Sequence, residues 1–126
     1  MQNAECRMQN EDKDLRQRTK MDGRCVIRLY SALPKGTVAQ VLGKQLLRSG
    51  TSVGANYREA DRARSKAEFL AKLGDCLREA AESEYWIELL GDEAVVPAKR
   101  LAPLLDETGQ LIAIFVTILK KGRGNE

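Results

Sequence analysis

Six basic side chains between residues 44 and 66 are suited to contact a polyanion. At about 100° per residue, the four on the predicted second helix fall within about 80° of one another, in a row roughly 27 Å long. Two acidic residues share this stretch, so its net charge is +4. Such a row can follow a phosphate backbone, and each neutralised phosphate makes binding more dependent on salt. The predicted nucleic-acid-binding residues, called the basic row below, are Lys44, Arg48, Arg58, Arg62, Arg64 and Lys66.

The basic row has two alternative interpretations. It could be a helix face that is simply solvated, or its arginines could meet acidic residues of a neighbouring subunit. Tyr57 is the only aromatic residue close by, which argues against sequence-specific recognition of a single strand by base stacking. Nucleic-acid binding and subunit contact are compatible only if part of the row meets the neighbour and part stays open.

The chain contains no histidine, and this excludes most acid–base and nucleophilic chemistry. Without imidazole there is no Ser-His or Cys-His pair, and no side chain has an ordinary pKa near neutrality. We expect Tyr57, Tyr85, Ser83 and Cys76 to be packing or capping residues, because no base is positioned to activate them. The sequence therefore predicts a protein that is not an enzyme.

Metal sites and phosphate loops are equally unsupported. Glu84 and Glu88 occupy successive turns of the third segment, but carboxylate-bridged metal bundles require Glu-x-x-His pairs. Residues 36–45 place six residues rather than four between the glycines, and Gln45 stands where a phosphate loop needs Ser or Thr. No cofactor or metal is predicted. We expect the inward Glu84 and Asp22 either to find buried hydrogen-bond or charge partners or to face a subunit contact.

The third segment is acidic where the second is basic. Residues 68–93 hold eight acidic and two basic side chains, and Trp86 lies in line with an outward acidic face that includes Glu79 and Glu82. Tryptophan is enriched at interfaces, and opposite charges on two helices favour head-to-tail association of identical subunits. The predicted oligomer-interface residues are Trp86, Glu79, Glu82, Gly50 and Gly54.

Composition indicates one domain in a reducing compartment. The 126 residues are 43% hydrophobic and 31% charged, enough for one aliphatic core, and the net charge of +3 is too small for general affinity for nucleic acid. Cys6, Cys25 and Cys76 form no CxxC pair, so neither a disulfide framework nor a thiolate metal site is expected. The longest apolar run, 111–116, is too short to span a membrane. We expect a cytoplasmic protein without a membrane partner.

Breakers at 33–36, 61–64 and 91–97 divide residues 13–121 into four segments with apolar residues three and four apart. This pattern predicts an all-α, up-and-down antiparallel four-helix bundle, flanked by flexible tails at 1–12 and 122–126. Ser65 and Glu68 form a capping box at the start of the third helix. Asp22–Gly23 is a weak point of the first helix, and Pro103 predicts a kink or a late start of the fourth.

The second helix is predicted to be continuous, although residues 49–54 resemble a loop. Its apolar face keeps one register from end to end, as a loop would not; the residues on this face are Val38, Leu42, Leu46, Ser49, Val53, Asn56 and Ala60. Gly43, Gly50 and Gly54 fall together on one flank. They either permit close approach of another helix or reflect tolerance of small residues, and both interpretations stay open.

Four phrases resemble one bacterial family: residues 14–20 (DLRQRTK), 52–60 (SVGANYREA), 65–69 (SKAEF) and 84–90 (EYWIELL). They are similar to the four helix bundle proteins first noticed as reading frames within intervening sequences of 23S rRNA genes. The similarity covers about residues 13–121, with the motifs in the same order. In the family's SxGAN-x-x-E phrase, Gly54 is interpreted as close packing and Asn56 as a satisfied buried amide.

The resemblance implies a ring-shaped homopentamer without established enzymatic activity. It also implies kinship with the basic accessory proteins of diversity-generating retroelements, which are associated with nucleic acid and a reverse transcriptase. The sequence departs from its relatives at Asp22–Gly23 and at Glu84, because the relatives tend to have apolar residues at these positions. Our leading hypothesis is an oligomeric bundle that binds RNA or DNA backbone through the basic row; the alternative is a homo-oligomeric interaction scaffold with no nucleic-acid role.

Overall fold

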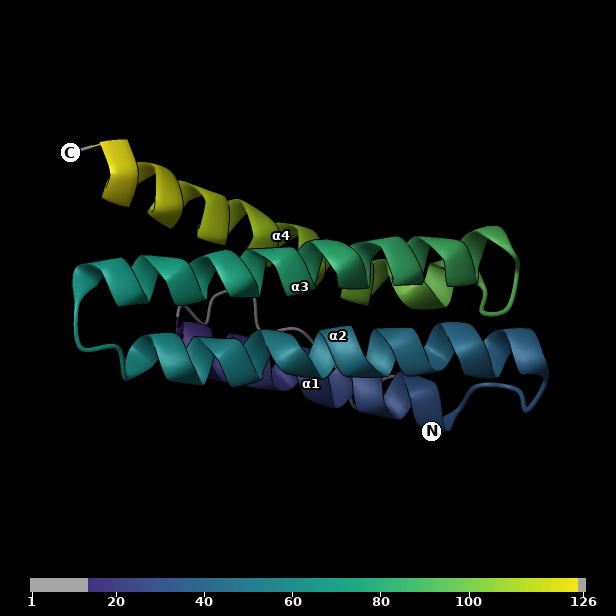
Figure 1. Ribbon diagram of the computed structural model, residues 1–126. Helices are drawn as coiled ribbons and strands as arrows, with labels where there is room; N and C mark the ends of the chain where they lie inside the picture. The colour runs from purple at the N-terminus through teal and green to yellow at the C-terminus, as the bar shows by residue number, and fades with distance from the viewer. Residues whose placement is uncertain (1–13, 125–126) are drawn as a thin grey trace.

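The computed structural model describes residues 14–124, which form four helices and contain no strand. Helix α1 spans Leu15–Ser31, α2 spans Thr37–Asp61, α3 spans Lys66–Asp92 and α4 spans Ala98–Gly124. The α1–α2 and α3–α4 connections lie at one end of the molecule and the α2–α3 connection at the other (Figure 1). The predicted up-and-down four-helix bundle is therefore confirmed. The predicted N-terminal tail, 1–12, lies outside the described residues, and α4 extends three residues past the predicted bundle end at 121.

Side chains at the helix starts satisfy backbone N–H groups that have no partner within the helix. Asp14 Oδ1 accepts a hydrogen bond of 3.0 Å from the Arg16 N–H at the start of α1. At the start of α3, Ser65 Oγ accepts from the Glu68 N–H at 3.1 Å, as a capping box requires. The Glu68 carboxylate closes the box on the Arg64 N–H, at 3.2 Å, and not on that of Ser65.

Helix α2 is one continuous helix, as the register of its apolar face predicts. Leu46, Ser49 and Val53 are buried on this face in the middle of the helix, where the sequence locally resembles a loop. Val38 differs from the prediction, because it lies in the first turn at the end of the bundle and is 59% exposed. The unbroken helix gives Lys44, Arg48 and Arg58 of the basic row a rigid support, whereas Arg62, Arg64 and Lys66 lie beyond its end.

Two apolar clusters form the core, one toward each end of the bundle. The first gathers buried side chains near the α1–α2 and α3–α4 connections, including Leu33, Leu46 and Leu101. The second is built around Phe115 and Leu73 and reaches Ala60, Leu70 and Leu119 near the other end. The aliphatic core expected from the low aromatic content is thus observed.

A buried polar network joins α1 to α4, the pair of neighbouring helices with the least extensive contact. Arg18 donates to both carboxylate oxygens of Glu107, at 2.9 and 2.7 Å, and to Gln110 at 3.1 Å. Thr108 Oγ1 donates to Asp22 Oδ1 at 3.4 Å, whereas Asp22 Oδ2 has no partner among residues 14–124. Burial, reinforced by the charge of Glu107, raises the pKa of Asp22 to about 7. Helix α1 nevertheless continues through the predicted weak point.

Helix α4 begins at Ala98 and runs through Pro103, so the predicted late start is wrong. Pro103 is exposed and lies close to the helix start, where few backbone hydrogen bonds are disturbed. Among the described residues, α4 alone is long and apolar enough to cross a membrane by length and composition. The longest apolar run, 111–116, did not predict this helix as a candidate membrane span because polar residues interrupt the helix. Leu111 and Phe115 of α4 are fully buried in the bundle core, and 33% of the apolar window is buried.

Candidate nucleic-acid interface

The basic row does not form one uniform surface. Lys44, Arg62, Arg64 and Lys66 are exposed, as predicted. Arg48 and Arg58 point toward opposite neighbours of α2. One contacts acidic residues of α3, and the other lies beside basic residues of α1. Arg48 and Arg58 therefore lie on different flanks of α2, one facing α3 and the other facing α1.

On the α3 flank, Arg48 is engaged within the chain. Its guanidinium contacts Glu82 at 2.6 Å and Glu79 at 3.3 Å. Glu82 also accepts a hydrogen bond of 3.0 Å from the Trp86 indole N–H. The hydrogen bonds from Trp86 and Arg48 lower the pKa of Glu82, and the bond to Glu82 raises the pKa of Arg48. The sequence did not predict this pairing of Arg48 within the chain, because a helix wheel shows nothing of the acids on the adjacent helix.

Contacts within the chain also involve three of the predicted oligomer-interface residues, Glu79, Glu82 and Trp86. Glu79 is only 6% exposed, so its predicted outward position is wrong; it accepts from Arg48 and Arg78 inside the chain. Trp86 is half-buried and packs against the first apolar cluster, with Tyr85 at its edge. Glu84, predicted to be inward, is only half-buried.

A further ion pair joins α2 to α3. Lys72 of α3 contacts Glu59 of α2 at 2.6 Å, which raises the pKa of Lys72 chiefly through that hydrogen bond. Beneath these pairs, Ser83 Oγ donates to Ser49 Oγ at 3.0 Å in the buried part of the interface. On the α3 flank of α2, the cations Arg48 and Lys72 are thus each paired with carboxylates of the facing helix.

The other flank of α2 meets α1 through the glycine strip. A Cβ at Gly50 would lie 2.7 Å from Val26 Cγ2, and one at Gly54 would lie 3.3 Å from the Thr19 carbonyl oxygen. Of the two interpretations of this strip, close approach of another helix is correct. The helix concerned is α1 of the same chain, so this contact accounts for the two glycines that were predicted at a subunit interface.

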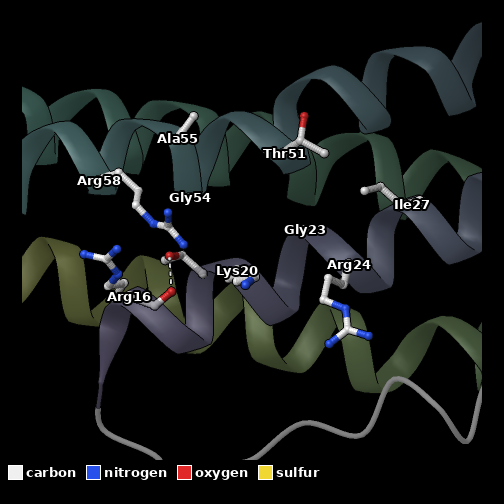
Figure 2. A pocket seen from close by; sticks show the side chains of 10 residues that line it. Arg16, Lys20, Gly23, Arg24, Ile27, Thr51, Gly54, Ala55 and Arg58 are labelled. Atoms are coloured by element: carbon white, nitrogen blue, oxygen red, sulfur yellow. Dashed lines mark hydrogen bonds between the residues drawn. The ribbon is translucent and has the colours of Figure 1, made fainter.

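A groove of about 290 Å³ lies where α1 and α2 approach closely. Its walls are Arg16, Thr19, Lys20, Gly23, Arg24, Ile27, Thr51, Gly54, Ala55 and Arg58. Four of these ten residues are basic and none is acidic. Figure 2 shows Arg58 reaching from α2 over Gly54 toward α1, with Arg16, Lys20 and Arg24 following one another along α1. We call this feature the cationic groove.

The charges of the cationic groove are largely uncompensated. Arg16 contacts Asp61 at 3.5 Å, in a pair whose two side chains are nearly half exposed. Lys20, Arg24 and Arg58 form no ion pair with any residue of 14–124. Exposed pairs such as Arg16–Asp61 contribute little energy, so an anion entering the groove meets four cations that lose little by turning toward it.

Sequence analysis missed the three cations that α1 contributes. Arg16, Lys20 and Arg24 are four residues apart, so they lie on one helix face, about 6 Å from one to the next. This spacing is visible in the sequence, but the first helix was analysed for its apolar stripe alone.

The Asn56 amide, predicted to be satisfied, donates to the Ser52 carbonyl oxygen at 3.0 Å.

The described residues offer little to catalysis or to a metal. No group of three or more Cys, Asp or Glu side chains within 14–124 is arranged to hold a metal ion. Burial raises the pKa of the Cys76 thiol to about 12, and that of the Tyr57 hydroxyl also rises through burial. Neither group is an activated nucleophile at neutral pH.

Comparison with known proteins identifies one family. The sequence profile of the 23S rRNA-intervening sequence protein family matches residues 11–117. The chain is also similar to a Bacteroides thetaiotaomicron protein of unknown function from the S23 ribosomal protein family. The two structures have a TM-score of 0.79 and 34% sequence identity, over 84% of this chain and 98% of that one. No curated protein matches the sequence.

Proposed function

This chain belongs to the 23S rRNA-intervening sequence protein family, and we propose that it is a non-enzymatic, oligomeric bundle protein that binds the sugar–phosphate backbone of RNA or DNA. The observation that carries the proposal is the cationic groove. Basic side chains from two helices converge there on one hollow, and no acid lies in its walls. The proposed contact residues are Arg58 of the basic row and Arg16, Lys20 and Arg24 of α1.

Electrostatics gives this surface its proposed role. Each backbone phosphate neutralised by Lys or Arg releases counterions, and the slope of log affinity against log salt steepens by roughly 0.7–0.9 for each contact. Four cations therefore correspond to a slope of about −3. The contacts involve phosphates and not base edges, so the proposed binding is tolerant of sequence.

The rest of the basic row has a graded part in this proposal. Arg62, Arg64 and Lys66 are exposed around the α2–α3 connection and extend the positive surface beyond Arg58. Lys44 is exposed nearer the opposite end of α2 and contributes to long-range attraction. Arg48 is left out, because its charge is already balanced by two carboxylates.

A salt series with matched variants tests the proposal. Fluorescence anisotropy would measure the affinity of mixed-sequence RNA and duplex DNA for the wild-type chain and for Arg58→Gln with Lys20→Gln. Arg100→Gln with Lys120→Gln is the control, since these two exposed cations lie on α4 and the change in net charge is the same. We expect the groove variant to lose at least about tenfold in affinity and the control less than about twofold. No binding by the wild-type chain at low salt, or equal losses in both variants, would refute the proposal.

Assembly into a homo-oligomer is the second part of the proposal. If the chain assembles but does not bind nucleic acid, the alternative of a homo-oligomeric interaction scaffold is favoured. Val38, Val41 and Tyr85 are each more than half exposed, and such apolar groups are suited to a subunit contact. The family resemblance implies a pentamer. Light scattering at micromolar concentration tests this assembly, and a monomeric mass would contradict it. Trp86→Ala should reduce the mass without unfolding the chain if Trp86 supports that contact.

A further inference from the structure

The base of the cationic groove is apolar and almost free of side chains. Gly23 and Gly54 bring the α1 and α2 backbones together, and a Cβ at Gly54 would already touch the Thr19 carbonyl oxygen at 3.3 Å. Thr51 and Ala55 add short side chains from α2, and both Thr51 hydrogen bonds go to carbonyls of its own helix. The groove thus has a smooth apolar base below a rim of cations.

An exposed isoleucine continues this base. Ile27 is 48% exposed although it lines the groove beside Arg24 (Figure 2). A large apolar side chain among cations has no partner within the described chain that covers it. Phosphate alone would engage the rim and leave both Ile27 and the apolar base in water.

A ligand that satisfies rim and base together must be amphipathic on the scale of one nucleotide. The volume of about 290 Å³ is just below the range for small-ligand pockets, which is roughly 300–1,000 Å³. In a single strand, the sugar and the unpaired base are free to lie on an apolar surface while the phosphate meets cations. In a duplex the bases are stacked inside, so that only phosphates reach the rim.

We infer that the cationic groove seats one nucleotide of a single-stranded nucleic acid. The phosphate lies on the Arg58–Lys20 rim, and the sugar or nucleobase lies on the apolar floor of the groove between Ala55 and Ile27. This inference rests on the proposed function and adds a preference for single strands over duplexes. The groove walls contain no aromatic side chain, so the preference arises from shape and apolar contact and is tolerant of sequence.

Filling the groove without changing its charge tests this inference. Ala55 is exposed on α2, and Ala55→Leu adds apolar bulk over the groove while leaving every cation in place. Ala81→Leu makes the same change at an exposed position of α3 and is the matched control. The probes are an unstructured 12-nucleotide RNA and the 12-base-pair RNA duplex that contains this strand, at one salt concentration.

We expect Ala55→Leu to weaken single-strand binding by about five- to tenfold, from the loss of one seated nucleotide, and to leave duplex binding within about twofold. Ile27→Gln should weaken the single strand in the same direction and leave the duplex unchanged. Ala81→Leu should change neither affinity. Circular dichroism would verify that each variant is folded.

Two results would overturn the inference. If Ala55→Leu leaves both affinities unchanged, or lowers both equally, the groove does not seat a nucleotide; loss of binding in the Arg58→Gln, Lys20→Gln variant would then still support the proposed function. If the wild-type chain binds neither probe at low salt, both the inference and the proposed function fail.

Discussion

The two flanks of α2 carry similar cations but different neighbours. On the α3 flank, Arg48 is held by Glu82 and Glu79, and the helices meet through buried serines. On the α1 flank, Arg58 lies beside three further cations, and the helices meet through glycines. Charge is thus neutralised along one contact and concentrated along the other.

The difference shows that a residue's chemistry depends on the helix beside it. Arg48 and Arg58 lie about 80° apart around α2, so the same residue type faces α3 at one position and α1 at the other. The acidic α3 closes the first flank, and the basic face of α1 opens the second to an anion. Three predictions test these contacts and the neighbouring α1–α4 contact.

The tight α1 contact should tolerate added bulk far less than the α3 contact. A Cβ at Gly50 would lie 2.7 Å from Val26 Cγ2, so Gly50→Leu must push the two helices apart. We expect it to lower the free energy of unfolding by about 3 kcal/mol. Ser49→Ala, at the next residue but on the other flank, should cost less than about 1 kcal/mol, because Ser83 keeps its bond to the Glu79 carbonyl oxygen. Urea unfolding of both variants measures the difference, and equal losses would contradict the contrast.

The stability of α1 should depend on pH through Asp22, which adjoins Gly23 of the groove but points to Thr108 of α4. Burial raises the pKa of Asp22 from 3.8 to about 7, so the folded chain retains a proton that the unfolded chain releases. The free energy of unfolding should therefore fall as pH rises from about 4 to about 7, by up to about 4 kcal/mol.

Asp22→Asn isolates this effect. The amide oxygen still accepts from Thr108, but the buried NH₂ group offsets part of the gain. We expect a net stabilisation of about 2 kcal/mol at pH 8 and none at pH 4. Urea unfolding at pH 4, 6 and 8 measures it. If the wild-type chain and the variant show the same pH dependence, Asp22 does not titrate in this range.

The ion pairs of the α3 flank should matter little to stability. Arg48 is half exposed, and exposed pairs contribute less than about 1 kcal/mol. Arg48→Gln should lower the free energy of unfolding by about 0.5–1 kcal/mol, because Glu79 is buried and loses one of its two partners. Thermal unfolding at low and high salt measures this, and a loss above about 2 kcal/mol would show that the pair is a major support of the contact.

Sequence alone predicts the fold well and the site only in part. Local rules act within one helix, so the Ser65 cap at the start of α3 and the continuity of α2 are predicted correctly. The glycine strip is also visible in the sequence, but not which helix approaches it. Partners on other helices are invisible to a single helix wheel, which is why the contacts of Arg48 with Glu79 and Glu82, and the burial of Glu79, were not predicted.

The groove depends on the relation between two helices and is missed for the same reason. Arg16, Lys20 and Arg24 have a regular spacing that can be recognised in the sequence. Their meaning depends on Arg58 lying across from them, and that requires the α1–α2 packing. Basic residues four apart can be recognised in the sequence on both the first and the second helix, but their convergence on one groove cannot.

The most direct test of the central claim compares the two arginines of α2 as nucleic-acid ligands. RNA affinity would be measured across a salt series for the wild-type chain, Arg58→Gln and Arg48→Gln, which change net charge equally. The contrast between the flanks predicts that Arg58→Gln weakens binding about five- to tenfold and reduces the salt slope by about 0.8, whereas Arg48→Gln stays within about twofold of wild type. Equal effects of the two substitutions, or a larger effect of Arg48→Gln, would contradict it.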